Sequence, residues 1–240
     1  MSRLKITPSV IPNLFTALNM FSGFLSIIYT SQNNFVYAGW LIIVAAIFDT
    51  LDGLMARLTK SSSELGVELD SLSDVVSFGA APSFMIYKFY FFQMDTIGII
   101  ISSLPLVAGG FRLARFNVQL VGFDKKHFTG LPIPSAALTL ATFILSFRKN
   151  GSEYLYDVIL LPMVIIISFL MVSKVRYDTL PKFSFQTVKE KPIQFIFILF
   201  AFIAIMIFNV KGLFFSFAAM ILLGIIRHFY FKFFTKPSRG

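Results

Sequence analysis

The 240-residue sequence contains no cysteine and few charged side chains. The absence of cysteine excludes a disulfide framework, a thiol nucleophile and a cysteine-ligated metal site. The two histidines, His127 and His228, each stand alone in an expected interfacial loop, so we do not expect a histidine metal site. Charged residues make up 14% of the chain and hydrophobic residues 56%, whereas a soluble domain averages about 25% charged residues. This balance predicts that lipid is the solvent.

Long uninterrupted apolar segments predict an all-α integral membrane protein. A helix needs roughly 20 apolar residues to cross about 30 Å of hydrocarbon, and these runs lack the two-residue alternation of a membrane barrel. We expect about eight transmembrane helices, over residues 10–30, 35–56, 66–91, 97–117, 132–147, 154–173, 193–209 and 212–230. The polar connection 174–192 divides the chain into a six-helix core, 1–175, and a basic connection with a terminal helix pair, 176–240.

The net charge of +9 is explained by membrane topology. If the N-terminus is cytoplasmic and the chain changes sides at each span, 17 of the 21 Lys and Arg residues face the cytoplasm. This positive-inside asymmetry predicts a multi-pass protein of the cell (inner) membrane with both termini cytoplasmic. The basic excess also suits anionic lipid headgroups, and we do not expect a nucleic acid partner. The first residues, interrupted by Pro8 and Pro12, are interpreted as a lead-in to the first span and not as a cleaved signal peptide.

Four aspartates gather in an apolar part of the chain. The stretch FDTLDGLMARLTKSSSELGVELDSLSD contains Asp49, Asp52, Asp70 and Asp74. The first two share one helical face at the cytoplasmic end of the second span, and the last two share one face at the start of the third. The polar turn between them, in which Ser61 and Glu64 have capping-box spacing, makes the two helices antiparallel neighbours. Glycine, alanine and serine residues between the acids allow the helices to pack closely.

Such a cluster requires compensating cations. One unpaired Asp at the bilayer centre costs about 2.5–3.5 kcal/mol on the insertion scale, and like charges on facing helices repel each other. Arg57 is a single positive charge and cannot neutralise four carboxylates. We therefore expect two divalent ions, Mg²⁺ or Mn²⁺, the arrangement that clamps a phosphoryl group during in-line displacement. Solvated loop acids and a cation-transport path are the alternatives.

The spacing of these residues resembles the signature of the CDP-alcohol phosphotransferase family. Every motif position is filled, in the form D-x2-D-G-x2-A-R-x8-G-x3-D-x3-D from Asp49 to Asp74. The resemblance implies a six-helix core with a site that faces the cytoplasm, and a homodimer. It also implies that the phosphatidyl group of CDP-diacylglycerol is transferred to an alcohol, with release of CMP.

The resemblance also implies roles for individual residues. The implied metal ligands are Asp49, Asp52, Asp70 and Asp74. Of these, Asp74 is also the implied general base, which takes the proton of the alcohol. The implied CDP-binding residues are Asp52, Gly53, Ala56 and Arg57. For Gly53 and Ala56, plain helix packing is an alternative interpretation.

Four further stretches narrow the acceptor alcohol. They are IPNLFTALNMFSGF (11–24), ELDSLSDVVSFGAAPS (68–83), FRLARFNV (111–118) and FTGLPIPSAA (128–137). Together they resemble the membrane-integral members of the family that use serine and make phosphatidylserine. Glycerol 3-phosphate or inositol phosphate is the alternative acceptor. A cation transporter and a lipid-binding scaffold without catalysis are alternatives of a different class.

Two sets of polar residues complete the expected site. Arg112 and Arg115 lie three residues apart on one helical face, where a guanidinium suits the serine carboxylate or a phosphate. Anchoring by the positive-inside rule is the alternative for both. Asn13, Thr16 and Asn19 recur on one side of the first span, where they bind the nucleotide of CDP-diacylglycerol or form interhelical hydrogen bonds.

Overall fold

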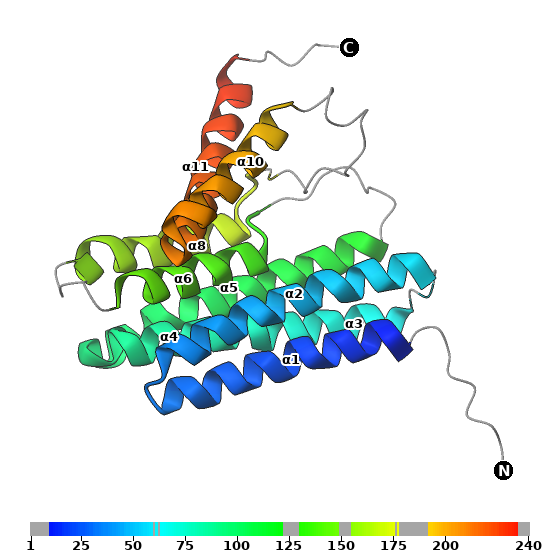
Figure 1. Cartoon of the computed structure of the whole chain (residues 1–240), viewed down its shortest axis with the longest axis horizontal. Helices are drawn as coiled ribbons and strands as arrows, with labels where there is room; N and C mark the ends of the chain where they lie inside the picture. Colours follow the sequence, from blue (N-terminus) through cyan, green and yellow to red (C-terminus); the bar gives the residue numbers. More distant parts are fainter. Residues whose placement is uncertain are drawn as a thin grey trace.

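The computed structural model describes residues 10–59, 61, 63–121, 130–148, 155–175, 177 and 192–234 (Figure 1). Its helices are α1 (Val10–Ser31), α2 (Phe35–Thr59), α3 (Glu64–Asp74), the π-helix η1 (Val75–Ala80), α4 (Ala81–Phe89), the 3-10 helix η2 (Phe91–Met94), α5 (Asp95–Val121), α6 (Ile133–Phe147), the π-helix η3 (Tyr156–Leu160), α8 (Leu161–Val172), α10 (Pro192–Phe208) and α11 (Val210–Phe234). No strand occurs within the described ranges, which confirms the all-α fold class.

Each of the eight expected spans coincides with a helical tract, and the third is the compound tract of α3, η1 and α4. Among the described residues, three helices are long and apolar enough to cross a membrane: Val10–Ser31, Phe91–Val118 and Val210–Tyr230. Shorter apolar helices cover Ile133–Phe147, Tyr156–Val172 and Leu199–Phe208. The fold is therefore helical and rich in membrane-compatible segments, and the number of eight transmembrane helices stays a prediction.

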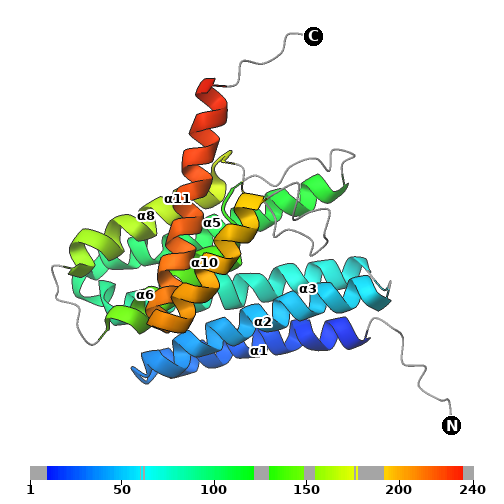
Figure 2. The same cartoon turned by 45° about the horizontal axis from the view of Figure 1, so that its top comes forward.

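The two C-terminal helices are attached to the core without being aligned with it. Figures 1 and 2 show α1 to α8 as a bundle of roughly aligned helices, from which α10 and α11 project steeply. Phe214 of α11 holds this pair to α6, because its ring packs on Phe143 and Phe147 with centroids 5.5 and 5.6 Å apart. Tyr177 adds a second contact, since its ring lies directly on Gly224 of α11.

The antiparallel helices α1 and α2 form a hairpin with a small, polar inner face. Asn33 makes the turn at φ 59°, a conformation that asparagine tolerates better than most residues. The residues that α1 buries are Pro12, Thr16, Asn19, Ser22, Gly23, Ser26 and Thr30. Ser26 Oγ donates a hydrogen bond to the carbonyl of Ala38 at 2.9 Å, which joins the two helices. Large apolar side chains of α1 point outward instead, as suits a helix surrounded by lipid.

The third helical tract changes its helical type directly after the last aspartate. α3 ends at Asp74, and the π-helix η1 follows without a break; single π-helical turns often mark functional sites. The N-cap of α3 is Ser63, whose side chain accepts a hydrogen bond from the backbone N–H of Gly66 at 3.1 Å. The capping box expected between Ser61 and Glu64 is therefore wrong, because the cap lies two residues later.

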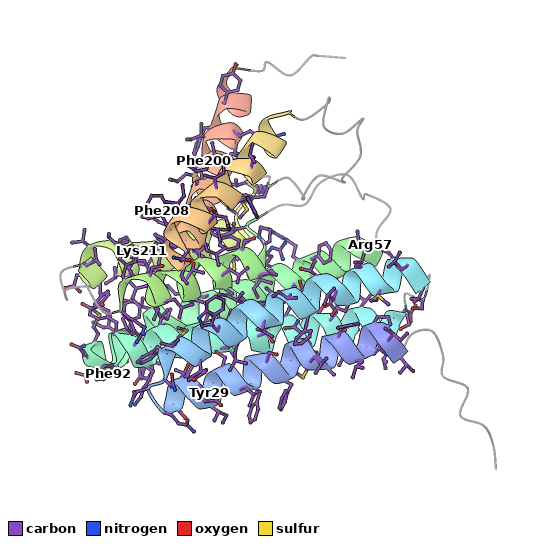
Figure 3. All side chains as sticks on the ribbon, in the orientation of Figure 1. Tyr29, Arg57, Phe92, Phe200, Phe208 and Lys211 are labelled. Carbon is purple, nitrogen blue, oxygen red and sulfur yellow. The ribbon has the colours of Figure 1, made fainter. Side chains whose placement is uncertain are left out.

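Aromatic side chains fill the end of the bundle opposite to the aspartates. Phe35, at the start of α2, packs edge-to-face on Phe89, with ring centroids 5.2 Å apart. Phe89 packs in the same way on Tyr156 at 5.1 Å, and such pairs stabilise by about 0.5–1.5 kcal/mol beyond their buried area. In Figure 3, Arg57 marks the end of the bundle near the aspartates and Tyr29 lies toward the aromatic end. The bundle thus has one polar end and one aromatic end.

We expect Gly23→Ala to destabilise the bundle. A Cβ at this position would lie 2.4 Å from Ser77 Oγ and 2.6 Å from Ser77 Cα, and overpacking costs about 1–3 kcal/mol. The backbone of η1 cannot rotate away as a side chain could, so thermal unfolding in detergent is expected to move down by several degrees. Gly110→Ala is the matched control, because no atom lies within 4 Å of a Cβ there and alanine favours the helix. Equal unfolding temperatures for the two variants would contradict this contact.

Candidate active site

Three of the four aspartates meet between α2 and α3. Asp49, Asp70 and Asp74 each offer a carboxylate oxygen, and these oxygens all lie within 4.8 Å of one another. Asp52 lies about one turn from Asp49 on α2 and is buried. Its Oδ2 accepts a hydrogen bond from Thr16 Oγ1 at 2.9 Å. The structure therefore places the fourth acid at the edge of the cluster and ties it to α1.

The cluster has many acceptor oxygens and few donors. The carboxyl groups of Asp49 and Asp74 lie within hydrogen-bonding reach of each other, and Asp52 is close enough to repel Asp70. Oδ1 of Asp70 and Oδ1 of Asp74 are buried and have no hydrogen-bond partner in the part of the chain that the structure describes. Leaving such oxygens unpaired costs on the order of 1–3 kcal/mol each or more. An all-oxygen donor set with unpartnered buried oxygens fits a hard divalent cation such as Mg²⁺ or Mn²⁺.

Helix α1 holds the aspartate-bearing segment through two serine hydroxyls. Ser73 Oγ donates to the carbonyl of Thr16 at 3.1 Å, and Ser77 Oγ donates to the carbonyl of Asn19 at 2.8 Å. The two serines flank Asp74 in the chain, so these bonds fix its position along α1. From the sequence, the serines on the acid face are expected to allow close packing against α2. Their spacing does not predict that they donate hydrogen bonds to α1.

The residues expected to line the CMP moiety lie toward the C-terminal end of α2. Gly53 is exposed, and no atom of the described residues lies within 4 Å of the place where its Cβ would be, so this side of it packs against no described helix. Arg57 is exposed and its Nε donates to the Gly53 carbonyl at 2.9 Å. Ala56 is half-buried. On α1, Asn13 is half-buried beside the start of α3, whereas Thr16 is engaged by its bond to α2.

The two arginines of α5 take different partners although they share a helical face. Arg115 Nη1 donates to the carbonyl of Val172 at 3.0 Å and Nη2 to that of Ser173 at 3.5 Å, so it caps the C-terminus of α8. Arg112 is half-buried, and its charge acts on Asp74. Its Nε is buried and has no hydrogen-bond partner among the described residues. The structure thus places Arg112 within electrostatic range of Asp74 and gives Arg115 a role in joining α5 to α8.

A further polar contact sets α5 beside α3. Asn117 Nδ2 donates a hydrogen bond to Ser71 Oγ at 3.0 Å. This bond joins α5 to α3, and α5 also packs on η1, the segment directly after Asp74. The pairing was not predicted, because helical periodicity assigns a residue to a face but does not say which neighbour that face meets.

Known proteins resemble this chain over the part that carries the site. The CDP-alcohol phosphatidyltransferase family matches residues 9–170. The chain is 40% identical over 176 residues to a Helicobacter pylori protein named CDP-diacylglycerol–serine O-phosphatidyltransferase, which covers 71% of this chain and 73% of that relative. It is 37% identical over 182 residues to the archaetidylserine synthase of Methanothermobacter thermautotrophicus, with 74% and 73% covered. A Bacillus subtilis protein with the same name as the first is 33% identical over 172 residues, with 72% and 92% covered.

The matched range contains all four aspartates and the helices that carry them. Its apolar helices, together with this match, indicate a multi-pass membrane protein. The family match covers more than half of the chain, and the relatives align over about three quarters of it. The chain therefore belongs to the CDP-alcohol phosphatidyltransferase family, and it is an enzyme of the phosphotransferase class.

Proposed function

We propose that this enzyme transfers the phosphatidyl group of CDP-diacylglycerol to the hydroxyl of serine and yields phosphatidylserine and CMP. The observation that carries the proposal is the cluster of Asp49, Asp70 and Asp74 at the polar end of an apolar bundle. The choice of serine is supported by the names of the relatives. Three relatives from different organisms have names that refer to serine or to a serine lipid.

The aspartates are proposed to hold two divalent cations, Mg²⁺ or Mn²⁺. Asp49, Asp70 and Asp74 supply oxygens from two facing helices, and Asp52 extends the donor set toward α1. When bound, such ions neutralise the diphosphate and the charge that develops on the transferring phosphoryl group. The hydrogen bonds from Thr16 and the serines of α3 and η1 keep the carboxylates in place before the substrate arrives.

Asp74 is proposed as the general base. The hydroxyl oxygen of serine forms a bond to the phosphorus of the phosphatidyl group, while the bond from that phosphorus to the CMP oxygen breaks. The electron pair of the broken bond leaves with CMP, and the hydroxyl proton passes to the Asp74 carboxylate. Among the described residues, the Oδ1 atom of Asp74 has no hydrogen-bond partner, which supports its use as a proton acceptor.

The substrates are proposed to lie on opposite sides of the aspartates. Arg112 of α5 is close enough to Asp74 for their charges to interact. It would bind the carboxylate of serine, since a guanidinium pairs well with a carboxylate. Arg115 is less suited to this role, because carbonyls of α8 already accept bonds from its guanidinium. The exposed backbone at Gly53, with Ala56, Arg57 and Asn13 nearby, would bind the CMP moiety.

We infer the membrane setting from the same features. The catalytic core covers residues 1–175, which include the family match, and residues 176–240 form the basic connection and the terminal helix pair. The distribution of Lys and Arg supports a cell (inner) membrane protein with both termini and the active site on the cytoplasmic side. The family resemblance supports a homodimer.

CMP release by the purified protein tests the acceptor directly. With CDP-diacylglycerol and Mn²⁺ present, we expect release to depend on serine and to be much slower with glycerol 3-phosphate, inositol phosphate or no acceptor. A preference for glycerol 3-phosphate would keep the reaction and change the acceptor. Metal-dependent cation flux through vesicles without CMP release would favour transport instead.

Asp74→Asn is expected to lower turnover by at least about 100-fold, because it removes the proton acceptor and keeps the shape of the side chain. Binding of CDP-diacylglycerol is expected to change much less. Asp49→Asn is expected to weaken both metal and CDP-diacylglycerol binding. Glu68→Gln is the matched control, since Glu68 is an exposed acid on the same helix as Asp74. Turnover and nucleotide-lipid binding at saturating Mn²⁺ give the result, and near-parental turnover by Asp74→Asn would place the base elsewhere.

Arg112→Gln is expected to raise the KM for serine by about tenfold or more, since a hydrogen bond to a charged group contributes about 1.5–3 kcal/mol. The KM for CDP-diacylglycerol is expected to change less. Arg115→Gln is expected to act differently, by lowering the unfolding temperature through loss of the cap on α8. Steady-state kinetics with each substrate varied, beside thermal unfolding, separate the two effects. A larger change in the KM for CDP-diacylglycerol than for serine would assign Arg112 to a phosphate.

A further inference from the structure

Asn19 of α1 is fully buried, and its side chain has no hydrogen-bond partner. Its exposed fraction is 0%, and both Nδ2 and Oδ1 lack a partner within the described residues. Leaving an amide unpaired in an apolar interior costs on the order of 1–3 kcal/mol. A buried polar group without a partner requires an explanation, and in an enzyme one explanation is a role that appears only when the site is filled.

The pairing of α1 with α2 places Asn19 at the level of Asp49. The two helices are antiparallel, and the Thr16–Asp52 hydrogen bond fixes their register near the site. Asn19 lies three residues beyond Thr16 on α1, and Asp49 lies three residues before Asp52 on α2. In antiparallel helices these steps run in the same direction along the bundle, so both residues lie about one turn deeper than the Thr16–Asp52 bond.

The pairing of α1 with α3 and η1 leads to the same level. Ser73 bonds to the carbonyl of Thr16 and Ser77 to that of Asn19, and Asp74 lies between the two serines in the chain. Asp74 therefore lies, along the bundle, at the level of the stretch of α1 between Thr16 and Asn19. The register along both neighbours therefore puts Asn19 at the depth of Asp49 and of the start of η1, about one turn deeper in the bundle than the Thr16–Asp52 bond.

We propose that Asn19 is a positioning residue for Asp49 and Asp74. When these carboxylates hold a divalent cation, the Nδ2–H group of Asn19 donates a hydrogen bond to one of their oxygens and fixes the carboxylate in its ligating orientation. Partners of this kind are typical of metal-binding side chains, and their loss lowers metal affinity about 10–100-fold. The inference rests on the proposed metal-dependent function. It gives Asn19 a positioning role, in which the residue neither binds substrate nor takes the proton.

The other polar side chains of α1 show why Asn19 is singled out. Ser22 and Ser26 each donate to a backbone carbonyl, and Thr16 donates to Asp52. Thr30 shares the full burial of Asn19 and also lacks a partner. It lies 11 residues further along α1, roughly 17 Å from Asn19 at 1.5 Å per residue and toward the end of the bundle opposite to the aspartates. Thr30 therefore provides a control with the same burial and helix but without the site.

The test is the affinity of the full-length protein for Mn²⁺, measured by titration with electron paramagnetic resonance in detergent without substrate. Asn19→Leu removes both polar atoms at nearly constant volume. We expect Mn²⁺ affinity to fall at least about tenfold. We also expect an unfolding temperature that is unchanged or higher, because removing an unpaired buried amide does not weaken the metal-free fold. Thr30→Val is expected to leave Mn²⁺ affinity unchanged.

Two further variants make every outcome decisive. Serine is smaller than asparagine, so Asn19→Ser fits the site even if leucine disturbs the packing. This variant is expected to lose Mn²⁺ affinity in the same way. Asp70→Asn in the otherwise unchanged protein reports the metal site itself. Parent-like Mn²⁺ affinity in both Asn19 variants, with loss in Asp70→Asn, would overturn the positioning role and leave the proposed function intact. Absence of Mn²⁺ binding by the parent protein would overturn the metal-dependent function and this inference with it.

Discussion

The repulsion between closely spaced carboxylates is the constraint on which the polar end of the bundle depends. Asp49, Asp70 and Asp74 bring oxygens within 4.8 Å of one another in an interior where charges are weakly screened. Two independent helices with these faces would separate. The structure prevents this by fixing both helices to a third, since α2 and the α3–η1 tract each hydrogen-bond to α1. The acidic cluster is therefore a property of three helices, although only two of them carry the acids.

The composition of α1 is explained by its role of holding α2 and the α3–η1 tract together. Between helices in lipid there is no hydrophobic driving force, so close packing and polar contacts must hold them together. The buried face of α1 consists of small and polar residues, and Gly23 allows the backbone of η1 to approach within a distance that a side chain would prevent. The outward face carries Leu14, Phe21 and Phe24, which suit a lipid environment. The same helix thus meets lipid on one side and organises the site on the other.

The sequence predicted the helical tracts and the acid-bearing faces, because both follow from local hydropathy and the 3.6-residue period. It also predicted that the two acid faces meet, but it did not predict the partners of the other polar side chains. Thr16 bonds to Asp52, and Arg115 bonds to the end of α8, whereas the charge of Arg112 acts on Asp74. The steep course of α10 and α11 was missed for the same reason, since it depends on contacts of α11 with α6 and with Tyr177. Periodicity defines faces, and only the tertiary structure pairs them.

The two ends of the bundle differ in a way that links stability to chemistry. At the aromatic end, rings from α2, α4 and η3 pack on one another, and Tyr90 donates a hydrogen bond to Asp157. At the acidic end, buried oxygens of Asp70 and Asp74 and the amide of Asn19 lack partners within the described residues. A fold tolerates such local cost only where packing elsewhere over-determines the structure. The helices run continuously between the two ends, so the packed end holds in place the carboxylates that the other end brings together.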